Sequence, residues 1–248
     1  MNTPRRRVDT LLVERGLFES RAKAQAAIAA GLVTADDVLV RKPSEAIRRD
    51  AALAARPAFP WVSRGGVKLA HALDHTGIQV ADRVCLDAGA STGGFTQVLL
   101  ARGARRVYAV DVGTEQLHDR LRGRPEIISL ETTDVRAVDA ARLGERPEVI
   151  TLDVSFISLK LVLPTAIALA ARPAHLLALI KPQFEAPRFA IRKGIVRDPA
   201  VHAAVCDDIA AFAAALGATG GVVFPSVIDG ADGNREFFLE ATIGATVG

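Results

Sequence analysis

Short apolar runs alternate with longer amphipathic stretches through the last three quarters of the chain. Runs rich in Val, Ile and Leu predict strands, and the stretches between them have the period of a helix. The predicted strands are residues 84–86, 106–110, 127–130, 149–152, 176–180, 220–224 and 237–242. One helix is predicted to end near residue 103, and others are predicted over 115–121, from 159 onward and over 199–216. This regular alternation predicts an α/β fold, a doubly wound and mainly parallel sheet that binds ligands at the carboxyl ends of its strands.

The first quarter of the chain has shorter predicted elements. A first helix ends at Gly16, and a second helix, capped by Ser20, ends at Gly31. Residues 32–34 and 38–40 then predict two short strands of a hairpin. Two short helices and a hairpin make a very small core, so we expect an adaptor attached to a larger domain.

A stiff apolar connector separates the two patterns. Pro57 and Pro60 restrict the residues before them to extended conformations. Trp61, the only tryptophan, is interpreted as a packing anchor rather than a base-stacking platform. The predicted parts are a small N-terminal domain of residues 1–58, a linker of residues 59–62 and a large domain of residues 63–248.

Charge is distributed unevenly along the chain. The formal net charge is +3, but residues 1–58 hold 11 Lys and Arg against 7 Asp and Glu, which leaves 20 against 21 for the remainder. A basic small module on a near-neutral larger one indicates binding to a polyanion through the small module. A solvated basic face would give the same count.

Other features of composition limit the class of protein. The longest nearly apolar stretch, residues 161–171, is interrupted by Pro164 and is too short to span a bilayer, and the N-terminus lacks the apolar core of a signal peptide. We therefore expect a cytoplasmic protein without a membrane segment. Cys85 and Cys206 have no metal-ligand spacing and form no disulfide framework, so no metal site is predicted.

The stretch V-C-L-D-A-G-A-S-T-G-G-F-T, residues 84–96, predicts a strand that breaks into a ligand-binding turn. Small residues let the backbone approach a ligand, and the next helix directs its N-terminal N–H groups toward it. The stretch matches neither the G-x-x-x-x-G-K-[ST] loop nor the G-x-G-x-x-G motif. Dehydrogenases, nucleotide-binding proteins and methyltransferases all remain compatible with it.

Polar residues follow the ends of the predicted strands and should therefore converge at one edge of the sheet. These residues are Asp87, Asp111, Asp134, Asp153 and Lys181. Asp111 can accept both ribose hydroxyls of a bound nucleoside, and Asp134 can contact an adenine amino group. Each aspartate taken alone could equally be a helix cap or a turn former.

Lysine is rare in this chain, which has 25 Arg and only 6 Lys. Two of the six are Lys68, in the helix predicted after the connector, and Lys181, after a buried strand. Residues 183–197 form a long polar loop that contains Arg192 and Lys193. A loop of this kind beside a site is often a lid or a substrate clamp, so we expect it to hold the phosphates of a nucleic acid.

The N-terminal pattern R-V-D-x-x-L-x-x-x-G-x-x-x-S-R-x-x-A, followed by G-x-V and K-P, resembles the alpha-L RNA-binding domain of the S-four ribosomal-protein type. The residues that carry the match are Arg7, Val8, Asp9, Leu11, Gly16, Ser20, Arg21, Ala24, Gly31, Val33, Lys42 and Pro43. The resemblance implies a set of residues that face RNA phosphates, namely Arg5, Arg7, Arg21, Lys23 and Lys42. One departure is Asp37 at the hairpin tip, where the family usually has Gly at positive φ.

In the large domain, Lys68, Asp153, Lys181 and Glu236 resemble the Lys-Asp-Lys-Glu tetrad of the FtsJ-like ribose 2'-O-methyltransferases. The chain from Arg5 to Thr242 resembles the TlyA (haemolysin-A-type) ribosomal RNA 2'-O-methyltransferases. The match is carried by V-S-R-G-G-x-K-L, L-D-A-G-A-S-T-G-G-F-T, D-V-S-F-I-S-L, I-K-P-Q-F-E, K-G-I-V-R-D-P and G-N-R-E.

This resemblance implies a Rossmann-like, S-adenosylmethionine-dependent methyltransferase domain behind a small α+β RNA-binding domain. The substrate would be ribosomal RNA in ribosomal subunits, with a cytidine ribose as the target and no metal involved. The implied cofactor-binding residues are Asp87, Gly89, Ser91, Gly93, Gly94, Phe95, Asp111 and Asp134, and the implied catalytic residues are the four of the tetrad.

The chemistry gives each member of the tetrad a role. A ribose 2'-OH is a very weak acid, so methyl transfer requires it to be positioned and relieved of its proton. A neutral lysine can take that proton, and Lys68 could supply the neighbouring cation that favours the neutral form of Lys181. Asp153 and Glu236 would orient the lysines and the hydroxyl. Lys181 either removes the proton or stabilises the oxyanion.

Three other functions are compatible with parts of the sequence. An RNA-binding protein with an inactive methyltransferase fold is disfavoured by the intact tetrad and cofactor loop. A pore-forming haemolysin is disfavoured because the sequence has no membrane segment. Methylation of a base or small molecule would need a different polar set, such as N/D-P-P-Y/F, and none follows the fourth predicted strand of the large domain.

Overall fold

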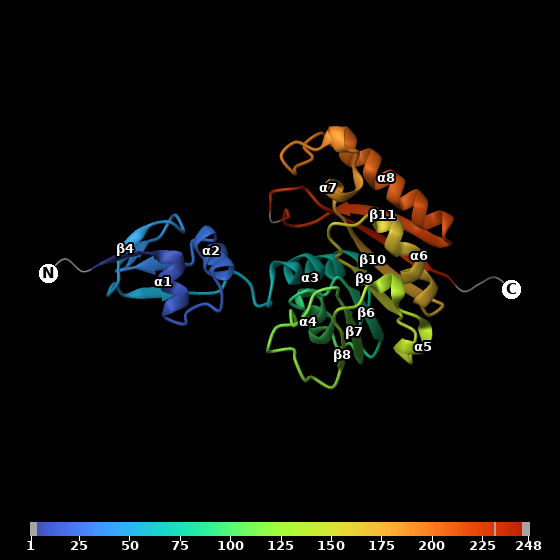
Figure 1. Ribbon diagram of the computed structural model, residues 1–248, viewed down its shortest axis with the longest axis horizontal. Coiled ribbons are helices and arrows are strands. Elements are labelled where there is room, and N and C mark those ends of the chain that lie inside the picture. The colour runs from blue at the N-terminus through green and yellow to red at the C-terminus, as the bar shows by residue number, and fades with distance from the viewer. Residues whose placement is uncertain (1–3, 231, 245–248) are drawn as a thin grey trace. The chain divides into compact units, whose positions relative to one another are not determined.

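The computed structural model describes residues 4–230 and 232–244, and the chain divides into two compact units, Met1–Pro60 and Trp61–Gly248 (Figure 1). Each unit has an apolar core of its own.

Two helices and a three-stranded antiparallel sheet share the core of the small unit. The helices are α1 (Val8–Glu14) and α2 (Arg21–Ala29). The sheet has the order β3-β2-β5 and consists of β2 (Val33–Ala35), β3 (Val38–Leu39) and β5 (Leu53–Ala55). Ser20 Oγ accepts the Lys23 N–H at 3.3 Å, so the predicted cap of the second helix is present.

Three strands of the small unit were not predicted, namely β1 (Arg5–Arg7), β4 (Ala46–Arg48) and β5. β1 pairs antiparallel with β4 and consists of three exposed arginines, so it has no apolar residue that would indicate a strand. At the hairpin tip, Asp37 has a φ of +63°. The aspartate therefore adopts the left-handed backbone that the position was expected to require.

Seven strands of the large unit form one sheet in the order β11-β12-β10-β9-β6-β7-β8. The strands are β6 (Val84–Ala88), β7 (Arg106–Val110), β8 (Ile127–Leu130), β9 (Val149–Leu152), β10 (Ala174–Ile180), β11 (Ala218–Pro225) and β12 (Phe237–Ile243). The five adjacent strands β10, β9, β6, β7 and β8 run parallel to one another, and β12 runs antiparallel to both β10 and β11. The predicted, mostly parallel α/β fold is confirmed.

Helices cover both faces of this sheet (Figure 1). They are α3 (Arg64–Thr76), α4 (Gly94–Ala101), α5 (Ala140–Leu143), α6 (Leu159–Leu169), α7 (Pro182–Glu185) and α8 (Pro199–Ala215), with 3-10 turns η1 (Val135–Ala137) and η2 (Arg188–Ala190). Side chains alternate along each strand, so Cys85 packs with α3 and α4, whereas Leu86 packs with α6 and α8. Both faces of the sheet are therefore buried, as in a doubly wound fold.

The helix predicted over residues 115–121 is wrong. Glu115 has a φ of +53°, and the Glu131 carboxylate accepts the N–H groups of Glu115, Gln116 and Leu117 at 2.8–3.0 Å. These N–H groups are those that the start of a helix leaves free, and here a distant carboxylate holds them in a turn. The leucines whose spacing suggested a helix, Leu117 and Leu121, pack beside Val62 instead.

Within the part of the chain that the structure describes, no helix is long and apolar enough to cross a membrane. Trp61 is half-buried and packs on α3, where a Cβ at Gly66 would lie 2.5 Å from the Trp61 Cβ. The tryptophan therefore fixes the segment that enters the large unit.

Candidate active site

The loop between β6 and α4 is built around glycines that no other residue could replace without strain. Gly89 has a φ of +85°, and a Cβ on it would lie 2.5 Å from the Asp153 carbonyl oxygen at the end of β9. Gly93 has a φ of +88°, and its Cβ would collide with the side chains of Leu117 and Leu121. The loop backbone therefore lies directly against the end of β9, and the predicted approach of these glycines to a ligand stays a prediction.

A cavity of about 480 Å³ lies beside this loop at the carboxyl ends of β7 and β8. Its lining includes Asp111, Asp134 and an apolar set made of Val110, Val112, Val135, Val154, Ile157 and Val162. Asp111 Oδ2 accepts the Ser91 N–H at 2.8 Å and Oδ1 accepts the Gly113 N–H at 2.7 Å. Each oxygen keeps a lone pair for a ligand hydroxyl.

Asp134 combines the two roles that its position suggested. It lines this cavity, and it also caps η1 by accepting the Arg136 N–H at 2.9 Å. The Arg136 guanidinium binds the same carboxylate at 2.6–3.0 Å, and its side-chain hydrogen bonds lower the pKa of Asp134. A contact with an adenine amino group stays a prediction.

Asp87 lies beneath the loop rather than in a cavity. Its side chain is fully buried and lines neither of the two cavities described here. Thr96 Oγ1 donates to Asp87 Oδ2 at 2.6 Å, and burial, as the largest cause, raises the pKa of Asp87 to about 7. The position does not fit a direct contact with the cofactor, so we expect Asp87 to join β6 to α4 and thereby shape the loop.

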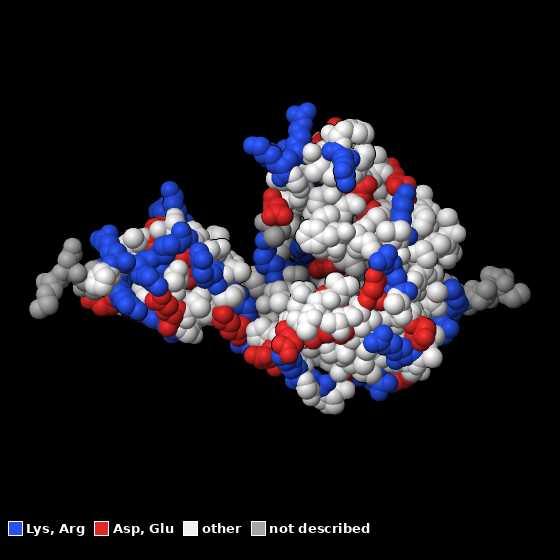
Figure 2. Space-filling model, in the orientation of Figure 1, with Lys and Arg blue, Asp and Glu red and all other residues white. Residues whose placement is uncertain are grey.

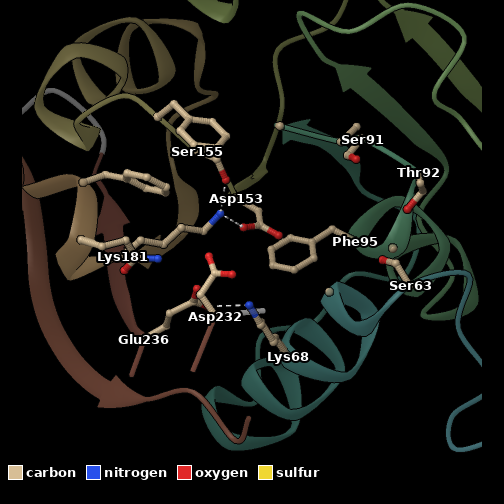
Figure 3. Close-up of a pocket in the computed structure, with 17 residues that line it drawn as sticks. Ser63, Lys68, Ser91, Thr92, Phe95, Asp153, Ser155, Lys181, Asp232 and Glu236 are labelled. Atoms are coloured by element: carbon tan, nitrogen blue, oxygen red, sulfur yellow. Dashed lines mark hydrogen bonds and ion pairs between the residues drawn. The ribbon is translucent and has the colours of Figure 1, made fainter. Parts of the chain in front are cut away.

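The four residues of the predicted tetrad line one cavity of about 360 Å³, although they come from four separate elements (Figure 3). Lys68 comes from α3, Asp153 follows β9, Lys181 follows β10, and Glu236 precedes β12. Gly89, Ser91, Gly94 and Phe95 line the same cavity, whereas Gly93 does not.

The tetrad forms two ion pairs. The Lys68 ammonium contacts Glu236, and both side chains are buried, with residue exposures of 8% and 3%. Lys181 Nζ lies 2.7 Å from Asp153 Oδ1 and donates a hydrogen bond of 2.7 Å to Ser155 Oγ. The contact with Asp153 is an ion pair without the alignment of a hydrogen bond, and Oδ1 accepts no hydrogen bond from the residues that the structure describes. Two cations and two anions thus neutralise one another in a nearly dry site.

Several residues of the site were not singled out from the sequence. Ser155 holds Lys181, and Asp232, Phe156 and Phe184 also line the tetrad cavity. Phe156 is 90% exposed and contacts Phe184, with ring centroids 5.0 Å apart. These residues lie within or beside motifs that carried the family resemblance, but which of them reach the cavity depends on the fold.

The two cavities are continuous in their lining. Gly89, Ser91, Asp153, Ser155 and Phe156 belong to both. A ligand whose flat ring occupies the larger, valine-lined cavity can therefore extend its other end to the tetrad.

On the small unit, two of the predicted RNA-binding residues, Arg7 and Arg21, contact a buried carboxylate. Asp9 is fully buried and accepts hydrogen bonds from Arg7, Arg21 and Gln25 at 2.8–3.3 Å. The guanidinium of Arg7, as the largest cause, holds the pKa of Asp9 well below its usual range. Both arginine side chains remain half-exposed, so donors of each still face solvent.

The remaining predicted RNA-binding residues have different surroundings. Arg5 and Lys42 are exposed on the same small unit, and Lys23 forms an ion pair with Glu19. Figure 2 shows lysine and arginine side chains spread over the visible face of this unit. Arg192 and Lys193 lie on the large unit, in the loop after α7, and both are exposed. Asp9 is part of the N-terminal sequence motif, but the sequence did not indicate that it holds Arg7 and Arg21 in place.

Together, the doubly wound sheet, the glycine loop and the paired lysines and carboxylates define a Rossmann-like methyltransferase. Residues 61–242 match the FtsJ-like methyltransferase family, and residues 6–52 match the S4 domain. The chain belongs to the FtsJ-like methyltransferase family, and the predicted relationship to the TlyA proteins is confirmed by the relatives below.

The 16S/23S rRNA (cytidine-2'-O)-methyltransferase TlyA of Mycobacterium tuberculosis is 44% identical over 238 residues, which cover 95% of this chain and 89% of the relative. Hemolysin A of Brachyspira hyodysenteriae is 40% identical over 194 residues, covering 77% of this chain and 81% of the relative. A solved structure described as a hemolysin of Streptococcus thermophilus is 39% identical, covers 98% of this chain and 90% of its own, and superposes with a TM-score of 0.77.

Proposed function

We propose that this chain transfers a methyl group from S-adenosylmethionine to the 2'-OH of a cytidine ribose in ribosomal RNA. The observation that carries the proposal is the meeting of Lys68, Asp153, Lys181 and Glu236 in one cavity that continues into a nucleoside-sized cavity. Membership of the FtsJ-like methyltransferase family and the activity named for the TlyA relative support the same reaction.

The residues of the larger cavity fit the proposed cofactor. Asp111 has free acceptor sites for the two ribose hydroxyls, and the valine-rich walls suit a flat adenine ring. Gly89 and Ser91 lead from there to the tetrad, where the methionine end would lie. When bound, S-adenosylmethionine supplies the electrophilic methyl group.

The tetrad positions the nucleophile. We place Lys181 next to the 2'-OH, because Asp153 and Ser155 hold its ammonium in the cavity. Lys68 is instead paired with Glu236. For the 2'-oxygen to accept the methyl group, the hydroxyl would have to lose its proton. Lys181 either accepts that proton in its neutral form or stabilises the developing negative charge as a cation.

The proposal is tested with labelled S-adenosylmethionine and ribosomal subunits that lack the modification. We expect the wild type to methylate a cytidine ribose and Lys181→Ala to lower kcat by about 100-fold or more. Lys160→Ala is the matched control, because Lys160 is a surface lysine paired with Asp208 and should leave kcat unchanged. The absence of ribose methylation by the wild type would refute the function.

Lys181→Arg separates the two roles of the lysine. An arginine keeps the positive charge but cannot accept a proton at neutral pH. Activity near the wild-type level would assign charge stabilisation, whereas activity as low as that of Lys181→Ala would assign proton transfer. Undiminished transfer by Lys181→Ala would remove Lys181 from the mechanism.

We further propose that the small domain, residues 1–58, binds the ribosomal RNA. The net charge of this segment, the half-exposed Arg7 and Arg21 beside Asp9, and the S4 match over residues 6–52 support this assignment. A substrate within ribosomal subunits would also place the protein in the cytoplasm.

A further inference from the structure

The loop of residues 186–197 carries cations that have no counter-ion. Arg188, Arg192, Lys193 and Arg197 form no side-chain hydrogen bond or ion pair with any residue that the structure describes. Three other exposed arginines of the same unit are paired: Arg102 with Asp74, Arg124 with Glu126 and Arg136 with Asp134. Figure 2 shows basic side chains projecting into solvent where this loop lies in Figure 1. Unpaired cations at this density indicate a site for an anionic partner.

An exposed aromatic ring stands among these cations. Phe189, on η2, is 87% exposed. With Arg192, Ile195 and Arg197 it lines a hollow of about 560 Å³. A phenylalanine that is left in water between arginines offers one face for stacking and the cations for phosphates, which is the combination used to bind single-stranded nucleic acid.

The loop is held in place by contacts of its own. The Asn234 side chain is buried; its Oδ1 accepts the Val196 N–H at 3.1 Å, and its Nδ2 donates to the Gly194 oxygen at 2.9 Å. Arg192 and Ile195 exchange two backbone hydrogen bonds of 2.9 and 3.0 Å. A surface that is ordered before binding loses little conformational entropy when the partner arrives.

The loop also begins beside the tetrad. Gln183 and Phe184, on α7 immediately before the loop, line the tetrad cavity. A nucleic acid whose target ribose enters that cavity therefore has its neighbouring nucleotides within reach of the loop.

We propose that Phe189 and the four cations bind an unpaired segment of ribosomal RNA next to the target nucleotide, with one base stacked on Phe189 and phosphates at Arg188 and Arg192. This inference rests on the proposed function, because it takes the substrate to be RNA. The segment is unpaired because a base inside a duplex has both faces covered by its neighbours. A basic surface without the aromatic ring would have fitted a duplex equally well.

The test compares Phe189→Leu with Phe189→Tyr, which remove and retain the aromatic face. With unmodified ribosomal subunits as substrate, Phe189→Leu should raise KM by roughly 5- to 100-fold, the range expected for loss of one stacked base. Saturating kcat and the Kd for S-adenosylmethionine should stay unchanged, and Phe189→Tyr should behave as the wild type.

Two further measurements identify the partner. Arg192→Gln combined with Lys193→Gln should reduce the slope of log KM against log salt, whereas Arg124→Gln, a paired surface arginine, should leave it unchanged. Ultraviolet cross-linking of the wild type to subunits that contain 5-iodocytidine should join Phe189 to RNA. Cross-links between the protein and the RNA that do not include Phe189, or a wild-type KM for Phe189→Leu, would overturn the inference.

The two failures can be told apart. Failure of the proposed function appears as the absence of ribose methylation by the wild type. Failure of this inference alone appears as normal methylation by the wild type together with an unchanged KM in Phe189→Leu.

Discussion

Asp87 is a carboxylate with no solvent contact, and its environment determines how it titrates. Burial outweighs the hydrogen bond from Thr96 and raises the pKa to about 7, against an ordinary value of 3.8. A carboxyl group with a raised pKa binds its proton more tightly in the folded protein than in the unfolded chain. Its favourable contribution is therefore complete below about pH 4, decreases as pH rises and is lost above about pH 7.

Asp87→Asn should remove this pH dependence, because the amide has the same shape and keeps an acceptor for Thr96. The free energy of unfolding of the wild type, relative to that of Asp87→Asn, should fall between pH 4 and pH 7 and stay level beyond it. Urea denaturation at pH 5, 6, 7 and 8 measures the difference. A constant difference across this range would show that Asp87 ionises normally.

At the scale of elements, the apolar runs predicted most of the large unit. β7 and β8 have the bounds that the sequence predicted. The last four residues of β7 are buried, whereas β8 is an edge strand without a buried residue, so its isoleucines and leucine were a sufficient signal without full burial. Prediction was wrong where a distant residue decides the backbone, as Glu131 does for residues 115–121. It also missed β1, whose arginines give no apolar signal.

The sequence predicted which residues gather at the site, but not which of them contact one another. Asp111, Asp153 and Lys181 were expected at one edge of the sheet because each follows the end of a predicted strand. The family resemblance added Lys68 and Glu236. We had expected Lys68 to act as a cation beside Lys181. In the structure each lysine has its own carboxylate, because α3 places Lys68 against Glu236, which lies 168 residues away along the chain.

The segment held by Glu131 leads to a prediction about the cofactor. Gln116 lines the larger cavity, and the Glu131 carboxylate fixes its N–H and those of its two neighbours. These hydrogen bonds lower the pKa of Glu131, with that from the Leu117 N–H contributing most. Glu131→Ala should weaken S-adenosylmethionine binding by roughly 5- to 30-fold, equivalent to about 1–2 kcal/mol, since the segment loses its anchor.

Isothermal titration measures this change, and the matched control is Glu126→Ala. Glu126 is a half-buried glutamate that pairs with Arg124 and does not line the cavity, so its removal should not alter the Kd. At saturating cofactor, Glu131→Ala should retain the wild-type kcat, because none of the tetrad residues contacts Glu131. Equal affinities for the two variants would show that residues 115–117 do not shape the cofactor site.

At the scale of the whole molecule, the phosphate contacts proposed for the small unit and the tetrad lie in different units, so variants at these two places should have separable effects. In the small unit, Arg7 and Arg21 form ion pairs with the buried Asp9, whereas the tetrad lies in the large unit. Loss of phosphate contacts on the small unit should raise KM for the RNA substrate. Changes in the tetrad should lower kcat.

Asp9→Asn tests this division. The amide has no charge to hold two guanidinium groups, so we expect KM for ribosomal subunits to rise by roughly 10-fold and its salt dependence to weaken. S-adenosylmethionine binding and saturating kcat should not change. Glu14→Gln is the control, because Glu14 pairs with Arg6 and Arg49 on the surface of the same unit and not with Arg7 or Arg21.

The loss of a buried carboxylate could also unfold the small unit, since breaking a buried ion pair typically costs about 3–5 kcal/mol. Arg21→Lys keeps both the buried carboxylate and the charge and removes only the planar fork, so it isolates phosphate recognition from folding. A rise in KM for Arg21→Lys, with an unchanged thermal unfolding curve, would assign the effect to RNA contact. If both Asp9→Asn and Arg21→Lys bind subunits as the wild type does, the RNA must be held by other residues.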